Sequence, residues 1–306
     1  MRLQKPPATY EPTYGWVDAQ IYCADDWLVM SFRITFLGTG GGRHTTMYQT
    51  RSTGGMLIQH DGKTIHMDPG PGALVQMNKI RYDLTKTDSV MISHCHPDHY
   101  SDAECVIEGM TRGGWEKRGN VYGSVTVVEG QDGLGPCLSD YHMKIPQGVH
   151  VFKPGDVLDV DGIRVDIHHA NHSDPTNVGF TFHTEHGLVS YVSDTAYSDE
   201  IADRYCGTRV LILPVTTPSG NRIKYHLCTD DALTFINRVK PELAIFTHLG
   251  VVMLRRGADK EAEYVERKTG IKTIAGHDLM TLEVGNELIL SDAQTYNGEW
   301  IPDSSP

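Results

Sequence analysis

A short stretch of the chain concentrates residue types that bind metal ions. It is Ser93-His94-Cys95-His96-Pro97-Asp98-His99, between an apolar run typical of a buried strand and a pattern typical of a helix. In extended backbone, side chains two residues apart point the same way, so His94 and His96 can bind one ion. Asp98 and His99 lie where the chain turns into the helix, and they can face a second ion beside the first. Neutral imidazoles with a carboxylate suit zinc, and they do not exclude iron or manganese.

The elements around this stretch are mainly strands in the first half of the chain, with helices at intervals. Residues 31–37 alternate apolar and polar side chains, and Asp61-Gly62 is a hairpin signal between two strand-like segments. Residues 103–110 and 232–239 each have one apolar face at helical spacing. Other segments are expected as strands at 90–92, 188–193, 210–213, 243–246, 280–283 and 286–290, as short strands over about 120–190, and as a charged helix at 258–269. Two such mixed halves predict two sheets packed face to face with helices outside.

The segment from His94 to His99 has the pattern HxHxDH and resembles the signature of the metallo-β-lactamase superfamily. The resemblance covers about residues 31–290. Phe36-Leu37-Gly38-Thr39-Gly40 is similar to the opening strand and loop of the ribonuclease Z branch, and Asp68 matches an aspartate that supports the metal loop in this family. The resemblance implies an α/β fold of the four-layer αββα sandwich type. Residues 30–306 would form a single catalytic domain, and residues 1–29 an N-terminal extension.

The same resemblance implies three further ligands, each after an expected strand. His172 is the first, because a strand is expected from Val178 onward; His168 and His169 are its rivals. Asp194 lies in a Ser-Asp-Thr motif whose aspartate bridges two metals in the family. His248, at the end of another strand, is the last. The implied metal ligands are therefore His94, His96, Asp98, His99, His172, Asp194 and His248.

Such a set implies two divalent ions, with Zn²⁺ favoured over Mn²⁺ or Fe²⁺, that activate water for hydrolysis. Asp98 is expected to orient the nucleophile and accept a proton. His226 resembles the HST-like histidine of ribonuclease Z and related phosphodiesterases, and it is expected to protonate the leaving oxygen. The alternative for His226 is a helix-capping role. His277 is expected to be structural.

The expected substrate is an anionic small molecule or a terminal phosphodiester. The net charge of −12 disfavours extended nucleic acid as a partner. The chain also lacks the glutamate of the HEAT-like segment, since Leu211–Thr216 occupies that place, and no tRNA-clamping arm is evident. Three expected loops, Gly40–Gly55, Gly113–Gly119 and Thr216–Lys224, contain or adjoin cationic side chains that could favour an anion. These are Arg43, His44, Arg51, Arg112, Lys117, Arg118, Arg222 and Lys224.

Three other functions use similar residues. A hydrolase of lactones, thioesters or amides would need the same metals. An iron oxygenase resembling persulfide dioxygenases keeps HxHxDH but uses one iron. A binding protein without catalysis would be expected to have lost ligands, and this chain keeps the complete set.

The location of the protein is expected to be cytoplasmic. The first thirty residues have no continuous apolar core, and no apolar run is long enough to span a bilayer. The six cysteines are scattered without a CxxC pair, which favours reduced thiols. No membrane partner is expected, and the sequence is compatible with a homodimer.

Overall fold

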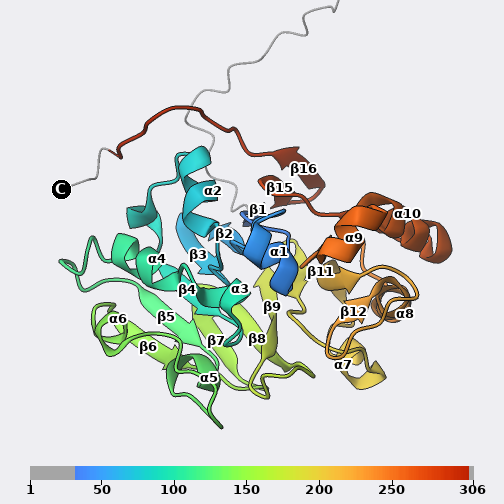
Figure 1. The fold of residues 1–306 in the computed structure, drawn as a ribbon, viewed down its shortest axis with the longest axis horizontal. Helices are drawn as coiled ribbons and strands as arrows, with labels where there is room; N and C mark the ends of the chain where they lie inside the picture. Colours follow the sequence, from blue (N-terminus) through green and yellow to red (C-terminus); the bar gives the residue numbers. More distant parts are fainter. Residues whose placement is uncertain (1–31, 303–306) are drawn as a thin grey trace, which may run out of the picture. The chain divides into compact units, whose positions relative to one another are not determined.

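The computed structural model describes residues 32–302. The expected extension at 1–29 lies outside these residues. The described chain forms two mixed β-sheets, in the strand orders β16-β15-β1-β2-β3-β4-β5-β6 and β14-β13-β11-β10-β9-β8-β7, with β12 paired to β11 (Figure 1).

The first sheet collects strands from both ends of the described chain. Its strands are β1 (Phe32–Phe36), β2 (Met56–His60), β3 (Lys63–Met67), β4 (Ser89–Ile92), β5 (Asn120–Gly123), β6 (Gly148–Val151), β15 (Met280–Val284) and β16 (Leu288–Asp292). The pair β2–β3 is the hairpin expected around Asp61-Gly62, with Ile58 opposite Ile65. From β3 to β6 the strands are parallel, so their carboxyl ends share one edge of the sheet.

The second sheet is contiguous in sequence. Its strands are β7 (Val157–Val160), β8 (Ile163–His169), β9 (Val178–Thr184), β10 (Gly187–Tyr191), β11 (Thr208–Thr217), β12 (Leu227–Cys228), β13 (Leu243–Thr247) and β14 (Lys272–Ala275). Strands β10, β11, β13 and β14 run parallel, as connections through helices require.

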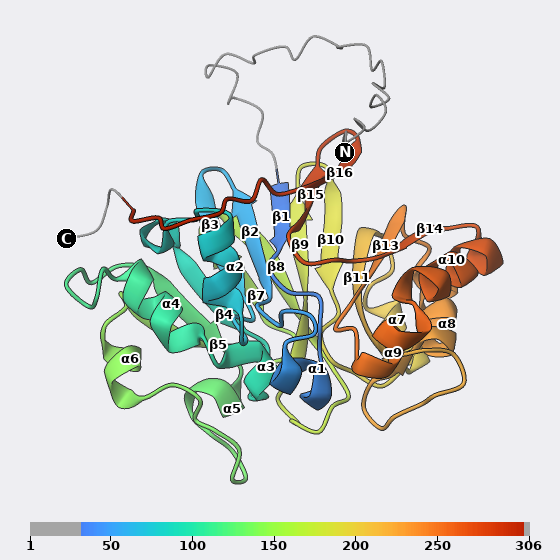
Figure 2. The ribbon, with the colours of Figure 1, turned by 45° about the horizontal axis from the view of Figure 1, so that its top comes forward.

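The helices lie on the outer faces of the sheets and at the edge where the parallel strands end (Figure 2). They are α1 (Arg43–Tyr48), α2 (Ala73–Lys79), α3 (Pro97–Tyr100), α4 (Ala103–Met110), α5 (Val125–Val128), α6 (Asp140–Lys144), α7 (Asp199–Asp203), α8 (Thr229–Val239), α9 (Val251–Arg256) and α10 (Ala258–Thr269), with a short 3₁₀ helix at Leu84–Lys86. No helix within residues 32–302 is long and apolar enough to cross a membrane.

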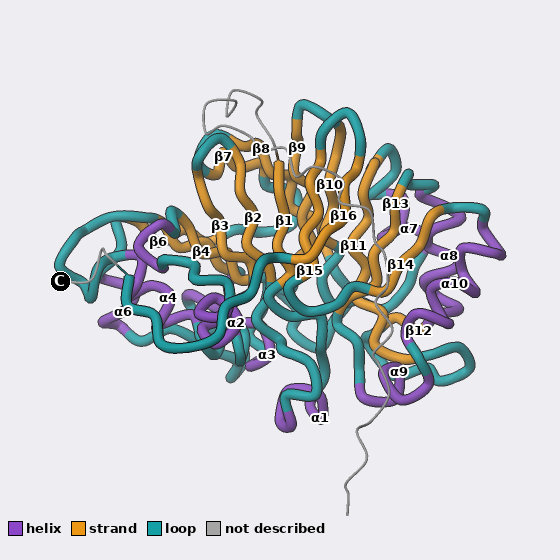
Figure 3. Tube along the Cα trace, turned by 90° about the horizontal axis from the view of Figure 1, so that it is seen from above, coloured by secondary structure: helices purple, strands orange, loops and turns teal. Residues whose placement is uncertain are grey.

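Three buried apolar clusters make the layers. One lies between the sheets and joins residues such as Phe36 of β1 to Phe180 of β9. A second packs α8 and α10 on the second sheet, and a third packs α2 and α4 on the first sheet. The view from above shows the strands of the two sheets in the middle, with helices on either side (Figure 3). This arrangement confirms the α/β four-layer αββα sandwich.

Several local expectations differ from the structure. The glycine-rich segment Gly40–Gly55 was expected as a loop, but it contains α1, which begins at Arg43. The region 120–190 contains the short helices α5 and α6 besides its strands. The strand expected at 210–213 is longer, since β11 runs from Thr208 to Thr217 and pairs with both β10 and β13. Its extra length brings Thr216 to the site described next.

Candidate metal centre

Four of the expected ligands meet at the edge where the strands end. His94 and His96 follow β4, His172 follows β8, and Asp194 follows β10. His96 Nδ1 lies 3.0 Å from both His94 Nε2 and His172 Nε2. Asp194 Oδ2 lies 4.0 Å from His94 Nε2 and 3.9 Å from His172 Nε2. Three imidazole nitrogens and a carboxylate oxygen that converge in this way can hold one metal ion.

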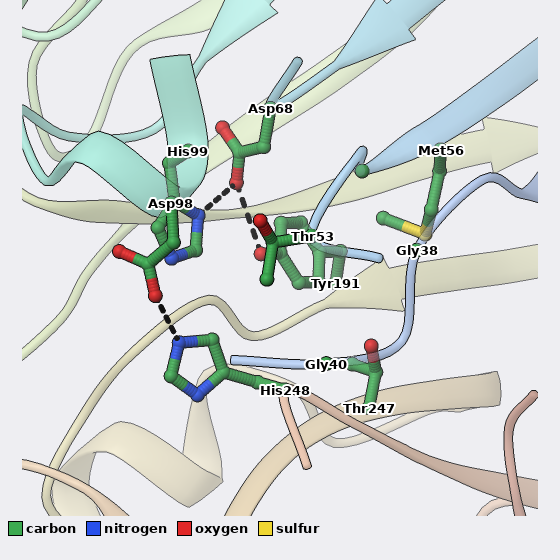
Figure 4. Close-up of a pocket in the computed structure, with 11 residues that line it drawn as sticks. Gly38, Gly40, Thr53, Met56, Asp68, Asp98, His99, Tyr191, Thr247 and His248 are labelled. Carbon is green, nitrogen blue, oxygen red and sulfur yellow. Dashed lines mark hydrogen bonds and ion pairs between the residues drawn. The ribbon is translucent and has the colours of Figure 1, made fainter. Parts of the chain in front are cut away.

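The other expected ligands form a second group beside the first. It contains Asp98, His99 and His248, from the start of α3 and the end of β13. His248 Nε2 lies 3.3 Å from Asp98 Oδ2 (Figure 4). Asp194 Oδ2 lies 3.1 Å from His248 Nε2 and 3.6 Å from His99 Nε2, so one carboxylate contacts both groups. Asp194 therefore lies between the two groups, close to the histidines of both.

The far ring nitrogen of each buried histidine is tied to the protein. His172 Nδ1 donates to Tyr225 O at 3.1 Å, and His248 Nδ1 is 2.9 Å from Thr216 Oγ1. His94 Nδ1 is 3.0 Å from Ser93 Oγ, which itself donates to a carboxylate and therefore accepts from the ring. These bonds leave the lone pairs of the Nε2 atoms directed into the cluster, as metal ligation requires.

Asp68, at the end of β3, supports the metal loop as the resemblance implied. Its buried carboxylate accepts hydrogen bonds from Ser93 N (2.7 Å), Ser93 Oγ (2.8 Å), His99 Nδ1 (2.9 Å) and Tyr191 OH (2.9 Å). Figure 4 shows the last two bonds, with Asp68 on the far side of His99 from Asp98. Asp68 therefore orients His99 and fixes the start of the loop that carries His94.

The charge states of the cluster suit a cation. Burial lowers the pKa of His172 to about 4 and that of His94 well below its usual range, which keeps both rings neutral. Burial alone would raise the pKa of Asp194, but the nearby histidines, His248 first, outweigh it and hold the pKa well below normal. Burial would likewise lower the pKa of His248, but Asp194 and Asp98 raise it to about 9. The carboxylates thus attract positive charge at this position.

Two buried atoms of the cluster lack a hydrogen-bond partner among the described residues. They are Asp194 Oδ1 and His99 Nε2. Unpaired buried polar atoms cost free energy, about 1–3 kcal/mol each, and they are rare in folded proteins. Bound metal ions would give both atoms a partner, so the residues present fit a two-metal site.

The glycine-rich segment after β1 packs directly against the second group. Gly42 N donates to Asp98 Oδ2 at 2.9 Å. A Cβ atom on Gly41 would come within 2.2 Å of the His248 ring, so only glycine fits there. Three residues at the ends of strands in this region, Asp68, Ser193 and His248, have positive φ (51°, 57° and 53°). Residues other than glycine rarely adopt this backbone conformation. Where they do at a functional site, it turns the side chain away from the direction that a regular strand would give it.

His226 lies on the open side of the cluster. Its Nδ1 donates to Lys224 O at 3.0 Å, and its Nε2 lies 3.4 Å from Asp194 Oδ2. The ring stacks on His248 at a centroid distance of 5.6 Å and meets His172 edge-on. His226 thus adjoins both groups, and geometry alone would also allow it to act as a ligand with Asp194 and His248.

The rivals for these positions lie elsewhere. His168 Nε2 bonds Thr181 Oγ1 within the second sheet, and His169 is exposed at the end of β8. His277 Nε2 pairs with Asp292 at 2.6 Å on the surface. None of the three contacts the cluster, whereas His172 does.

A cleft of about 680 Å³ opens beside the cluster. Its lining includes the ligands His96, Asp98 and Asp194, together with His226. The lining also includes residues of α1 and of the segment between Thr216 and His226. The cleft gives a small molecule access to the candidate metal ions.

Sequence reasoning missed several groups that shape the site. Asp278 accepts from Thr39 N (2.9 Å) and Ser52 N (2.8 Å) and so fixes the glycine-rich segment. Asp174 is buried under the metal loop and accepts from Cys95 N at 3.0 Å. Thr216 and the Tyr225 carbonyl hold histidines through contacts distant in sequence. Only the glycine run itself carried a signal, because consecutive glycines mark a close approach of backbone.

Two mixed sheets with outer helices, and a His/Asp cluster at their strand ends, define a metal-binding αββα sandwich. A family model for the beta-lactamase superfamily domain matches residues 63–249. The chain therefore belongs to the metallo-β-lactamase superfamily, and its cluster is able to bind metal ions. The resemblance based on the HxHxDH pattern is confirmed.

Known proteins agree at different levels. An uncharacterized protein of Methanocaldococcus jannaschii is 39% identical over 84% of this chain and 97% of its own length. Ribonuclease Z of Methanosarcina acetivorans is 30% identical, over 47% of this chain and 46% of its own length. The fold resembles the metallo-beta-lactamase fold protein YhfI of Bacillus subtilis, with a TM-score of 0.70 and 18% identity over 83% of this chain and 99% of that one.

Proposed function

We propose that the protein is a dinuclear metal-dependent phosphodiesterase that hydrolyses small phosphodiesters. The observation that carries the proposal is the cluster itself: two ligand groups share Asp194, and a further histidine, His226, adjoins them on the side of the cleft. The two ligand groups support a hydrolytic reaction, and His226, as a candidate proton donor, supports a substrate whose leaving group needs protonation.

The ions would be held by two sets of side chains. His94, His96, His172 and Asp194 would hold one ion, and Asp98, His99 and His248 would hold the other together with the nearby Asp194. Histidines outnumber carboxylates in these sets, which favours Zn²⁺ over ions that prefer oxygen ligands, with Mn²⁺ and Fe²⁺ as alternatives. Bound divalent ions supply Lewis acidity and lower the pKa of a water molecule towards neutrality.

The protein side chains handle the protons. Asp98 Oδ2 accepts a hydrogen bond from Gly42 N, which holds the carboxylate at the cluster. His226 Nδ1 donates to a backbone carbonyl, so Nε2 is the nitrogen available to give a proton to the leaving oxygen when the ring is doubly protonated. The Lys224 carbonyl also fixes the ring plane. Asp98 and His226 are therefore our candidates for base and acid.

The size of the cleft and the similarity to ribonuclease Z support a small phosphodiester. A volume of about 680 Å³ suits a small molecule or a chain end, not a folded nucleic acid. The ribonuclease Z relative aligns over about half of its length, so its activity is carried to this chain only at the level of phosphodiester hydrolysis.

The alternatives differ in what they require. A mononuclear iron oxygenase would use one ligand group, and it would leave the second group, Asp98, His99 and His248, without an ion. A thioester hydrolase would use the same ions, but its thiolate leaves without a proton, so His226 favours the phosphodiesterase over it. A lactone leaves as an alkoxide, and the substrate comparison below separates that activity from the phosphodiesterase.

A substrate comparison tests the proposal. The protein is stripped with a chelator, reloaded with Zn²⁺, Mn²⁺ or Fe²⁺, and offered bis(p-nitrophenyl) phosphate, a lactone and a thioester, each with a metal-free control. We expect metal-dependent release of nitrophenolate from the diester as the fastest reaction. Rapid hydrolysis of the lactone or thioester without turnover of the diester would contradict the phosphodiesterase assignment.

A further inference from the structure

The cationic side chains of the three expected loops divide into two kinds in the structure. Four of the eight are engaged within the protein. Arg222 pairs with Asp231 at 2.6 Å, Arg112 pairs with Glu116 at 2.9 Å, and Arg51 Nη1 donates to the Thr39 hydroxyl. Arg118 contacts backbone carbonyls. These cations stabilise loops, and they are not available to a ligand.

Of the other four cations, Arg43 and Lys224 line the cleft beside the cluster, whereas His44 and Lys117 do not. The side chains of Arg43 and Lys224 are exposed, and neither has a carboxylate partner among residues 32–302. Lys224 Nζ lies 4.4 Å from the centroid of the Tyr225 ring, a cation–π contact that orients the amine without neutralising it. Arg43 begins α1 directly after Gly42, whose N–H holds Asp98.

The backbones around these two residues are tied to the cluster at two different groups. Gly42 N donates to Asp98, and the Lys224 carbonyl accepts from His226. The two cations therefore line the same cleft, each on a segment that is hydrogen-bonded to a residue at the cluster. The acidic residues of the cleft lining are Asp98 and Asp194, which the metal ions would neutralise.

A charge balance follows from this arrangement. Among the groups that face the cleft, two divalent ions would bring four positive charges; Asp98, Asp194 and a hydroxide would cancel three, and the single charge of a phosphodiester the fourth. Arg43 and Lys224 would then remain at the cleft without a carboxylate partner among its lining residues, and as exposed cations they would attract a further anion. A substrate with only the scissile phosphodiester would leave both cations unused.

We propose that the substrate carries a second anionic group, a carboxylate or a phosphate, that binds between Arg43 and Lys224 while its phosphodiester lies at the metal centre. This inference rests on the proposed function and narrows the substrate to a small phosphodiester with at least two negative charges. The second group contributes binding and orientation and takes no part in bond breaking.

Calorimetric binding of two phosphinates tests the inference without turnover. Diphenylphosphinate mimics a diester with one charge and has no hydrolysable bond; its analogue with a para-carboxylate on one ring adds the second charge. The zinc-loaded protein should bind the carboxylated ligand about tenfold more tightly, as two partly exposed ion pairs allow. In Arg43→Gln/Lys224→Gln the advantage should disappear, while the affinity for diphenylphosphinate stays close to that of the parent protein.

Arg222→Gln is the matched control, because it removes a neighbouring cation that already has a carboxylate partner. This variant should still bind the carboxylated ligand more tightly than diphenylphosphinate. Equal affinity of the parent protein for both ligands, or an equal loss of both in the double variant, would overturn the second-anion inference alone. Failure of the parent protein to bind either phosphinate would overturn the phosphodiesterase proposal as well.

Discussion

Replacement of Asp68 by Asn tests how far the metal centre depends on a residue that is not expected to touch metal. Asp68 Oδ1 accepts from Ser93 N, and Oδ2 accepts from the Ser93 hydroxyl, His99 Nδ1 and Tyr191 OH. An amide has one oxygen, so in either orientation its NH₂ group faces a buried donor. One unsatisfied donor costs about 1–3 kcal/mol of stability.

The effect on metal binding should be larger than a general loss of stability would give. Without a carboxylate on Nδ1, His99 loses the partner that fixes its orientation and basicity, and such losses weaken metal affinity about 10–100-fold. That range corresponds to about 1.4–2.8 kcal/mol. Competition with a chromophoric chelator measures the zinc dissociation constant, and urea unfolding of the zinc-free protein measures stability separately.

Asp278→Asn supplies the control for this prediction. Asp278 also accepts from backbone N–H groups of two loops, but it has no hydrogen bond to a histidine of the cluster. We expect it to lower stability and to change zinc affinity far less than Asp68→Asn. The reasoning is refuted if Asp68→Asn binds zinc as tightly as the parent protein, or if the two variants weaken binding equally.

Three further predictions concern the cluster and its surroundings. Asp194→Ala should lower metal occupancy of both groups and abolish hydrolysis, measured by metal analysis and diester turnover; an active variant would place the bridge elsewhere. His226→Ala should slow the hydrolysis of a diester with an alkyl leaving group by roughly 10²–10⁴-fold and that of a nitrophenyl diester far less, with unchanged metal content. Loss of metal from this variant would show that His226 is a ligand. The control His277→Ala should have no effect on either rate. Burial lowers the pKa of His66 to about 4 in the folded protein, whereas an unfolded histidine has a pKa of about 6.5. Between these pH values the unfolded chain binds a proton that the folded chain does not. The free energy of unfolding should therefore fall by roughly 3 kcal/mol from pH 6.5 to pH 4. His66→Gln should show a correspondingly smaller fall in urea titrations, and an unchanged pH dependence would contradict that origin.

Much of the fold could be predicted because its signals are local. The alternation in β1, the hairpin around Asp61 and the apolar faces of α4 and α8 are set by residues a few positions apart. The four site residues within the segment from His94 to His99 could be predicted for the same reason. They lie where a strand passes into a helix, so the local backbone sets the directions of their side chains.

The rest of the site depends on contacts that the sequence does not display. Gly42 is bonded to Asp98 across 56 positions, and Asp278 holds Thr39 across 239. Nothing in the spacing of Arg43 or Arg222 indicates that the first is unpaired and the second is engaged by Asp231. The family pattern favours His172 over His168, and the structure places His172 beside His96 and His168 against Thr181, contacts that the sequence does not display.

Metal stoichiometry tests the central claim most directly. Protein stripped with a chelator and dialysed against a small excess of Zn²⁺ should bind about two ions per chain, the number expected of a two-metal site. His94→Ala/His96→Ala should retain less than one ion, whereas the control His168→Ala/His169→Ala, with two histidines replaced outside the cluster, should keep about two. Full occupancy in the His94/His96 variant, measured by elemental analysis, would contradict the assignment of the centre.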